Sequence, residues 1–202
     1  MHFEILVEDP STRELLDILA PKILDDASHT YRLKSYRGVG HIPQGLQPKT
    51  DARHRMLLDQ LPRLLRGYGR SLDHRSQMVV VVVDNDDRDC RQFLSELERV
   101  LHRCRPRPKA LFRLAIEEAE AWLLGDRPAI LRAYPRAKTA VLSRYRQDSI
   151  CGTWELLAEA IGVGGRGNKT EWARRIGSEM DVDNNASPSF RKFRDGLRKP
   201  RV

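Results

Sequence analysis

The sequence has few cysteines, and none of them forms a pair with the spacing that binds zinc. The three cysteines, Cys90, Cys104 and Cys151, are odd in number and far apart in a chain of 202 residues. This pattern argues against a zinc ribbon and against a disulfide framework. The six histidines are scattered and match no metal-binding spacing either.

Long apolar runs are absent as well. The longest run is the six residues Met78–Val83, far too short to span a bilayer. The first residues, MHFEILVED, contain no basic segment followed by a long apolar stretch, so we expect no signal peptide. The sequence predicts a cytoplasmic protein that does not enter a membrane.

Lysine is scarce, although the chain is basic. Of 36 basic residues 8 are lysine and 28 are arginine, and the net charge is +8. Arginine recognises phosphate through its bidentate fork, so a nucleic-acid partner is one reading. Codon bias in a GC-rich genome would enrich arginine equally well. The basic residues form three clusters rather than one stripe, at Arg53–Arg70, Arg99–Lys109 and Arg191–Arg201.

Nucleotide-binding motifs are missing. The glycine-rich stretch Gly162–Gly167 does not follow a predicted strand, as a dinucleotide fingerprint requires, and the chain has no Walker lysine motif. We interpret the stretch as a flexible joint, from which Arg166 and Lys169 could reach a phosphate group.

The most informative stretch that is present is Met78–Cys90, MVVVVVDNDDRDC. A strand that is apolar on both faces is typical of a parallel sheet covered by helices. Ligands of such sheets bind beyond the carboxyl ends of the strands, where four aspartates follow here. Hard oxygen ligands at that edge favour a divalent cation. Alternatively, the aspartates cap the helix predicted at Arg88–Cys104, although one would suffice for that.

Strands and helices alternate in the first part of the chain, which predicts an α/β fold with a mainly parallel sheet flanked by helices. Strands are expected at Phe3–Val7, Thr30–Tyr36, Met78–Val83 and Lys109–Ile116. From Asp126 onward only helices are expected, at Pro128–Tyr134, Trp154–Ile161, Thr170–Met180 and Ser187–Leu197. We therefore divide the chain into an α/β domain, residues 1–126, and a small C-terminal helical extension packed on it, residues 127–202.

Local signals predict how two further helices begin and end. Ser11 and Glu14 have the spacing of a capping box at the start of a helix over Pro10–Leu24. A helix over Asp51–Arg66 contains Pro62, which predicts a kink or break near Leu61, and glycines at 67 and 69 should end the segment.

Carboxylates follow several of the predicted strands. Glu8 ends the first strand and Asp84 the third, so they meet at one sheet edge if these strands are parallel neighbours. Asp86 follows closely, and Glu117 and Glu120 come after the fourth strand. Converging carboxylates repel each other unless a cation or a proton intervenes, and Mg²⁺ suits such a site. Each residue also has a structural reading, Glu8 as a polar strand end, and Glu117 and Glu120 as partners of a helix dipole.

A strand ending in Glu, followed by a later apolar strand ending in Asp-x-Asp, resembles the Toprim fold. Here the segments are VED at Val7–Asp9 and VVVDND at Val81–Asp86. The chain more specifically resembles the Toprim-like family catalogued as domain of unknown function 4276. Three further segments carry this resemblance: IEEAEAWLLGD (Ile116–Asp126), NKTEWARRI (Asn168–Ile176) and NNASPSFRKF (Asn184–Phe193).

This resemblance implies a Toprim-like sheet, a site for Mg²⁺ (or Mn²⁺) and nuclease activity related to the nucleases of the overcoming-lysogenization-defect (OLD) type. It implies Glu8 as acid/base and metal ligand, Asp84 and Asp86 as the metal-binding pair, and Glu120 as a further ligand in an acidic motif with Trp122 and Asp126. Asp9 stands where many Toprim proteins have Gly.

The partners implied by the resemblance are nucleic acid, DNA before RNA, and an ATPase of the AAA or ABC type in a bacterial defence module. A homodimer is compatible with it. A different class of function stays open, a non-catalytic subunit that binds nucleic acid or the ATPase. A phosphatase of the haloacid-dehalogenase type would have Thr or Val where Arg88 stands, which argues against that third option.

Overall fold

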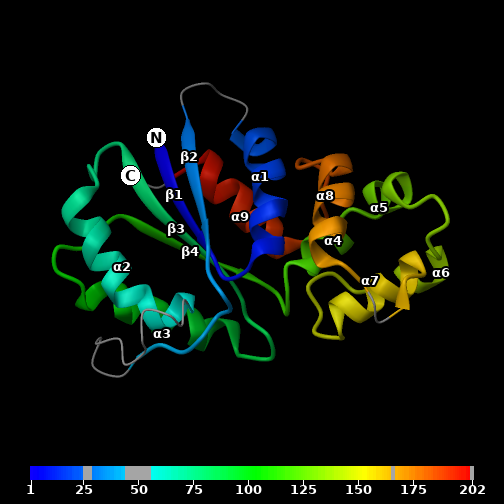
Figure 1. The fold of residues 1–202 in the computed structure, drawn as a ribbon, viewed down its shortest axis with the longest axis horizontal. Coiled ribbons are helices and arrows are strands. Elements are labelled where there is room, and N and C mark those ends of the chain that lie inside the picture. The colour runs from blue at the N-terminus through cyan, green and yellow to red at the C-terminus, as the bar shows by residue number, and fades with distance from the viewer. Residues whose placement is uncertain (25–28, 44–55, 165–166, 201–202) are drawn as a thin grey trace.

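The fold is organised by a four-stranded sheet in which every strand runs parallel (Figure 1). The computed structural model describes residues 1–24, 29–43, 56–164 and 167–200. The strands are β1 (His2–Val7), β2 (Thr30–Ser35), β3 (Gln77–Asp84) and β4 (Ala110–Ala115), in the order β2-β1-β3-β4. The expected α/β class with a parallel sheet is confirmed, and it is consistent with a Toprim-like fold.

The valine run of β3 lies at the centre of this sheet, buried on both faces. Val80 and Val82 belong to one hydrophobic cluster, and Val79, Val81 and Val83 belong to a second cluster on the other face. This division follows from the period of two residues that separates the faces of a strand. A run that is apolar at every position is therefore what a strand covered on both sides needs.

Helices cover both faces. The first cluster includes residues of α1 (Pro10–Leu24) and α9 (Pro188–Arg198), and the second includes residues of α2 (Leu57–Ser71) and α3 (Cys90–Arg103). The remaining helices, drawn on the right of Figure 1, lie beside α1 on one side of the sheet. They are α4 (Glu120–Leu124), α5 (Arg127–Ala133), α6 (Thr139–Leu142), α7 (Thr153–Ile161) and α8 (Lys169–Glu179).

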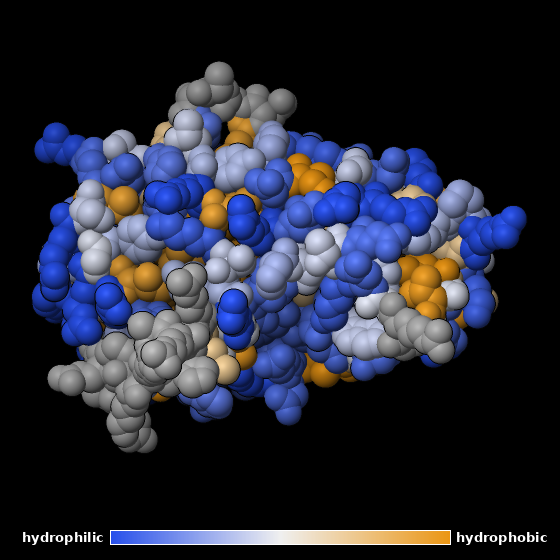
Figure 2. Space-filling model, in the orientation of Figure 1, coloured by the Kyte–Doolittle hydropathy of each residue, from blue (hydrophilic) through white to orange (hydrophobic). Residues whose placement is uncertain are grey.

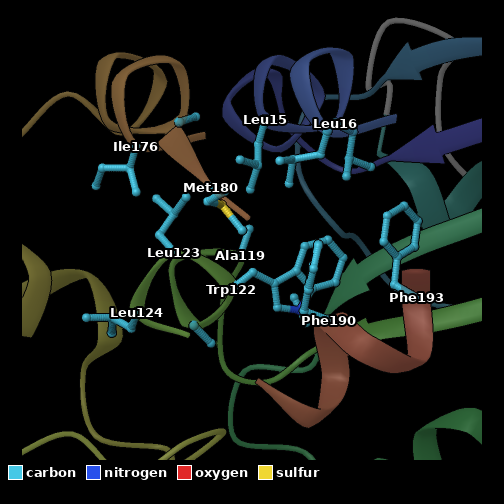
Figure 3. Packing of buried hydrophobic residues seen from close by; sticks show 14 of the residues in the cluster. Leu15, Leu16, Ala119, Trp122, Leu123, Leu124, Ile176, Met180, Phe190 and Phe193 are labelled. Carbon is cyan, nitrogen blue, oxygen red and sulfur yellow. The ribbon is translucent and has the colours of Figure 1, made fainter. Parts of the chain in front are cut away.

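The C-terminal helices share one hydrophobic core with the α1 face of the sheet. Figure 3 shows Leu15 and Leu16 of α1 near Trp122 of α4, and all three belong to the cluster that also holds Ile176 of α8 and Phe193 of α9. In addition, the ammonium group of Lys22 on α1 donates to three carbonyls at the end of α8. The division at residues 126 and 127 stays a prediction, but packing is continuous across it.

The start of α1 differs from the expected capping box. Asp9, not Ser11, caps the helix: its Oδ1 accepts the backbone N–H groups of Ser11 at 2.7 Å and of Thr12 at 3.0 Å. Glu14 instead accepts from Arg174 of α8 at 2.8 Å. A carboxylate one residue before Pro10 is a stronger acceptor than the Ser11 hydroxyl and complements the helix dipole. The capping-box prediction was wrong.

The second helix does not break near Leu61, where a kink or a break was predicted, and the prediction that glycines at 67 and 69 end it was wrong. α2 continues through Pro62 as far as Ser71, and Gly67 and Gly69 lie inside it. Leu61 and Leu65, both fully buried, anchor the helix on either side of Pro62, so packing outweighs the bond that proline cannot donate. The predicted first residues 51–55, the loop beyond residue 43 and Arg166 lie outside the described residues.

Gly69 of α2 faces the backbone that follows α3. A Cβ at this position would lie 2.1 Å from the carbonyl oxygen of Pro106, whereas a Cβ at Gly67 would meet nothing within 4 Å. We expect Gly69→Ala to destabilise the fold by about 1–3 kcal/mol through overpacking. The matched Gly67→Ala should be neutral or stabilise by up to about 1 kcal/mol, because alanine favours helices. Urea unfolding measures both, and equal effects would contradict this packing.

The molecular surface in the view of Figure 2 is mostly hydrophilic, and hydrophobic residues form small separate patches on it. Among the residues that the structure describes, the exposed large hydrophobic side chains are those of Met56, Ile150 and Val163, which are far apart in sequence. In the described part of the chain, no helix combines the length and the apolarity that a membrane crossing would require.

Candidate metal centre

Glu8 and Asp84 meet at the carboxyl-terminal edge of the sheet. β1 and β3 are parallel neighbours, with Val7 opposite Val82, so the residues at both strand ends lie next to each other. Each of the two carboxylates is only 8% exposed. One carboxylate oxygen from each of Glu8, Asp9 and Asp84 lies within 4.8 Å of the others. The structure thus brings the first and third strand ends together as the sequence predicted.

One oxygen of this cluster lacks a partner. Oε2 of Glu8 is buried and accepts no hydrogen bond from any described residue. A carboxylate oxygen of Glu8 and one of Asp84 lie within 4.8 Å of each other, so the two groups favour sharing a proton or a cation over carrying two full charges. An orphaned carboxylate oxygen beside two more carboxylates is a set of hard donors, and it fits Mg²⁺ or Mn²⁺.

The electrostatics of the pair follow from its burial. Burial raises the pKa of Glu8 to about 7, and the charges of Asp9 and Asp86 act in the same direction. Burial, followed by the charge of Glu8, also raises the pKa of Asp84 well above its ordinary value. Two buried carboxylates cannot both ionise without cost, so a proton or a cation has to be shared between them.

Asp86 lies at the rim of the centre rather than inside it. Its side chain is 51% exposed and pairs with Arg88 at 3.3 Å, and its backbone adopts a left-handed conformation with φ of 51°. It is near enough to raise the pKa of Glu8 through its charge. The predicted metal-binding pair therefore consists of one buried residue, Asp84, and one exposed residue, Asp86.

Asn85, between the two aspartates, was overlooked by the sequence reasoning. It is fully buried, and its side-chain oxygen accepts the N–H of Glu117 at 2.7 Å while its amide donates to the carbonyl of Arg88 at 2.7 Å. Its backbone N–H also donates to Ala115 of β4. Asn85 fastens the end of β3 to the end of β4. Its polarity within a buried strand end was the available signal.

Glu120, predicted as a further ligand, lies close to the centre but contacts a lysine. It is 4% exposed, and burial raises its pKa to about 7 even though Lys169 acts in the opposite direction. The ammonium group of Lys169 lies 3.4 Å from Oε2 of Glu120 and 2.9 Å from Oε1 of Glu118. Its nearest described partners are therefore carboxylates, and the expectation that Lys169 reaches a phosphate group stays a prediction.

A family model described as Domain of unknown function (DUF4276) matches residues 7–198. The chain belongs to the DUF4276 family. No curated protein and no solved structure matches the chain. The relationship to the OLD-type nucleases remains a prediction.

The three segments that carry the DUF4276 resemblance pack against one another. Trp122 of the first segment donates its indole N–H to Ser189 of the third at 2.9 Å, and its carbonyl accepts from Asn185 at 2.8 Å. Lys169 of the second segment reaches Glu120 of the first. These contacts tie the three segments to one another, so much of the DUF4276 pattern holds the C-terminal helices together around Trp122.

Two other acidic residues of the DUF4276 motif accept hydrogen bonds from helix N-termini and do not belong to the candidate metal centre. The carboxylate of Glu117 accepts the N–H groups of Gly152 and Thr153, each at 2.8 Å, at the start of α7. Asp126 caps α5 by accepting the N–H of Ala129 at 3.0 Å. As expected, Glu117 follows β4 at the edge of the sheet. Its carboxylate, however, binds the N-terminus of α7, where a negative charge interacts favourably with the helix dipole.

Asp9 contributes to both the centre and the fold. It belongs to the carboxylate cluster, yet its oxygens also accept hydrogen bonds from Ser11 and Thr12. These bonds hold its carboxylate beside Glu8 in a fixed orientation. In this DUF4276 chain the residue that departs from the Toprim glycine is therefore the cap of α1.

Proposed function

We propose that the protein is a nuclease that hydrolyses nucleic-acid phosphodiester bonds with the help of Mg²⁺. The observation that carries this proposal is the buried pair Glu8 and Asp84, with an unpartnered oxygen of Glu8 at the carboxyl-terminal edge of the sheet. A parallel sheet places its ligand at this edge. The positive net charge of +8 suits a polyanionic substrate.

The residues divide the chemistry between them. Glu8 and Asp84 would hold the cation, with Asp86 at the rim and Glu120 behind them as the remaining predicted ligands. A bound Mg²⁺ would supply Lewis acidity toward a phosphate oxygen. Glu8, whose pKa is raised by burial to about 7, can accept or release a proton near neutral pH, as an acid/base group in phosphoryl chemistry must.

The wider setting completes the proposal. DNA is the preferred substrate over RNA, and an ATPase of the AAA or ABC type is the proposed partner in a bacterial defence module. A cytoplasmic location and a homodimer belong to the same proposal. The substrate, the ATPase and the homodimer come from the resemblance of the chain to Toprim-like families, and the location comes from the absence of a long apolar run.

A non-catalytic regulatory subunit is the second candidate, and one contact favours it. Lys169 neutralises Glu118 and Glu120 at the back of the acidic edge, which leaves fewer carboxylates for a cation. Such a subunit would bind nucleic acid or an ATPase without any dependence on metal.

The test compares cleavage of plasmid DNA and RNA by the wild type and by Glu8→Gln, with Mg²⁺ or Mn²⁺ and with or without the cognate ATPase. We expect metal-dependent cleavage that Glu8→Gln lowers by about 10²–10⁴-fold, the range for a lost acid/base group. Glu96→Gln, the same change on the outer surface of α3, should cleave like the wild type. Cleavage that survives Glu8→Gln would remove the assigned centre, and binding without cleavage under every condition would favour the second candidate.

A further inference from the structure

Two hollows adjoin at the amino-terminal ends of β3 and β4. One, of about 440 Å³, is bordered by α3, and the other, of about 600 Å³, is bordered by α9. Met78 and Ala110 line both hollows, which together we call the amino-end groove. β3 runs from this groove to Asp84, so the groove lies at the opposite end of the strand from the candidate metal centre.

The amino-end groove is positively charged. Two carboxylates, Glu98 and Asp195, line it, and Asp195 already pairs with Arg194 at 2.8 Å. Five basic side chains also line it: Arg107, Lys109, Arg113, Lys192 and Lys199.

The lysines that line this groove are not paired with acidic side chains of the described residues. Among the residues the structure describes, no acidic side chain forms an ion pair with Lys109, Lys192 or Lys199. Elsewhere the pattern is different, since Arg132, for example, pairs with Glu179 at 3.0 Å. Unpaired cations in a concave surface raise the local concentration of anions.

This groove is where two basic clusters of the sequence meet. Arg99–Lys109 and Arg191–Arg201 are more than 80 residues apart, and α9 packs against the face of the sheet beside β4. His102 and Arg103 lie in the last turn of α3. A basic residue at this place is explained by its favourable interaction with the negative end of the helix dipole. This interaction does not explain Lys109, which precedes β4, or Lys192, which lies in the middle of α9.

The lining also indicates the kind of anion. Both hollows exceed the space of a single small ion and fall in the size range of ligand pockets. None of the described residues that line them is Phe, Tyr or Trp, so the groove offers no platform on which unpaired bases could stack. Lysines without aromatics suit the phosphate backbone of a duplex, which is recognised by charge alone.

We propose that the amino-end groove binds the backbone of duplex nucleic acid independently of divalent metal, at a site separate from the acidic centre. The inference rests on the proposed function only in taking nucleic acid as the partner. Lys109 before β4, Lys192 of α9 and Lys199 at the end of that helix supply the phosphate contacts. Arg107 and Arg113 add positive charge to the lining, although the guanidinium of Arg113 donates to the carbonyls of Lys192 and Phe112.

The test measures binding of a short labelled DNA duplex to the full chain in EDTA, by fluorescence anisotropy over a series of salt concentrations. We expect the double variant Lys109→Glu/Lys192→Glu to bind about tenfold more weakly or worse, since each lost phosphate contact removes counterion release. The slope of log affinity against log salt should fall by about 2. The variant Lys109→Gln/Lys192→Gln should lose affinity to a smaller extent and in the same direction.

Arg136→Glu/Arg146→Glu is the matched control, because it makes the same charge change at exposed positions flanking α6. We expect it to keep affinity and slope close to those of the wild type. An equal loss in this control, no binding by the wild type in EDTA, or equal competition by polyglutamate would overturn the proposal. The two proposals can fail separately. If the wild type binds duplex DNA through the groove but cleaves nothing, only the nuclease proposal is refuted. If it cleaves DNA, and Glu8→Gln lowers this cleavage, but the groove variants bind like the wild type, only the groove proposal is refuted.

Discussion

Asp84→Asn is expected to make the metal-free protein more stable at pH 8 while it abolishes the stabilisation that Mg²⁺ gives. The wild type buries Glu8 and Asp84 side by side, and both have raised pKa values. At pH 8 both would ionise in the unfolded chain, whereas the folded chain has to hold two adjacent buried charges or bind a proton. Replacing one charge with an amide removes this repulsion, and we expect a gain of about 2 kcal/mol in the free energy of unfolding.

The sign follows from proton linkage. Between an ordinary glutamate pKa of 4.5 and the raised value of about 7 for Glu8, the folded state binds more protons than the unfolded state. The stability of the metal-free wild type therefore falls as pH rises through this window, by about 3 kcal/mol for Glu8 alone if 1.36 kcal/mol is assigned to each pKa unit. Asp84→Asn removes the contribution of Asp84 to this dependence, so we expect a smaller fall, while the part that comes from the burial of Glu8 remains.

Urea unfolding in EDTA at pH 5 and pH 8, repeated with Mg²⁺, measures both effects. Asp87→Asn is the matched control, since Asp87 is exposed and lies three residues further along the same loop, and it should change stability by less than about 0.5 kcal/mol. An Asp84→Asn variant that is less stable than the wild type at pH 8 would show that the pair is a structural contact rather than a strained cation site.

Trp122→Ala is expected to destabilise the whole chain by about 3–5 kcal/mol, the usual loss for a large buried aromatic side chain. Trp122 is fully buried. Its ring stacks on Phe193 with centroids 5.0 Å apart and meets Phe190 edge-on at 5.6 Å (Figure 3). The variant leaves a cavity between the sheet, α1 and the C-terminal helices, and it deprives Ser189 of a donor.

Two probes can follow this unfolding. Far-UV circular dichroism follows the helices of the whole chain, and the fluorescence of Trp154 and Trp172 reports on α7 and α8. Because one cluster joins these helices to the sheet, we expect both probes to give the same transition in Trp122→Ala, where Trp154 and Trp172 are the tryptophans that remain. Trp154→Ala, at a partly buried position, is the control and should cost less. Separate transitions would show that residues 1–126 and 127–202 fold as independent units.

The sequence allowed the strands and most helices to be predicted because their signals are local. The run of consecutive valines, the turns rich in proline and glycine, and the helical spacing of apolar residues are each patterns within a few neighbouring residues. The meeting of Glu8 and Asp84 could also be predicted, since parallel strands that are neighbours end at the same edge. The neighbour relation itself was an assumption, which the pairing of β1 with β3 confirmed.

The errors concern contacts between residues that are far apart in the chain. The contact of Glu117 with α7 could not be predicted, because the N–H groups that donate to its carboxylate lie 35 and 36 positions away in the sequence. Lys169 could not be paired with Glu118 and Glu120 for the same reason. Pro62 was misjudged because a local rule predicted a break where buried leucines hold the helix together. Asp9 shows the reverse error, since its capping signal was local and the weaker serine was preferred.

The valine run has a consequence for insertions and deletions. Its five members are identical, so moving the strand by one position exchanges valine for valine on both faces of the sheet and leaves the apolar core almost unchanged. The valines in the interior of β3 therefore do not fix the register of this strand with its neighbours β1 and β4. Only its polar end does: a shift would place Asn85 or Val83 where Asp84 faces Glu8, and it would detach Asn85 from Ala115 and Glu117. Deleting one valine would be nearly silent for hydrophobic packing and disruptive for the acidic centre.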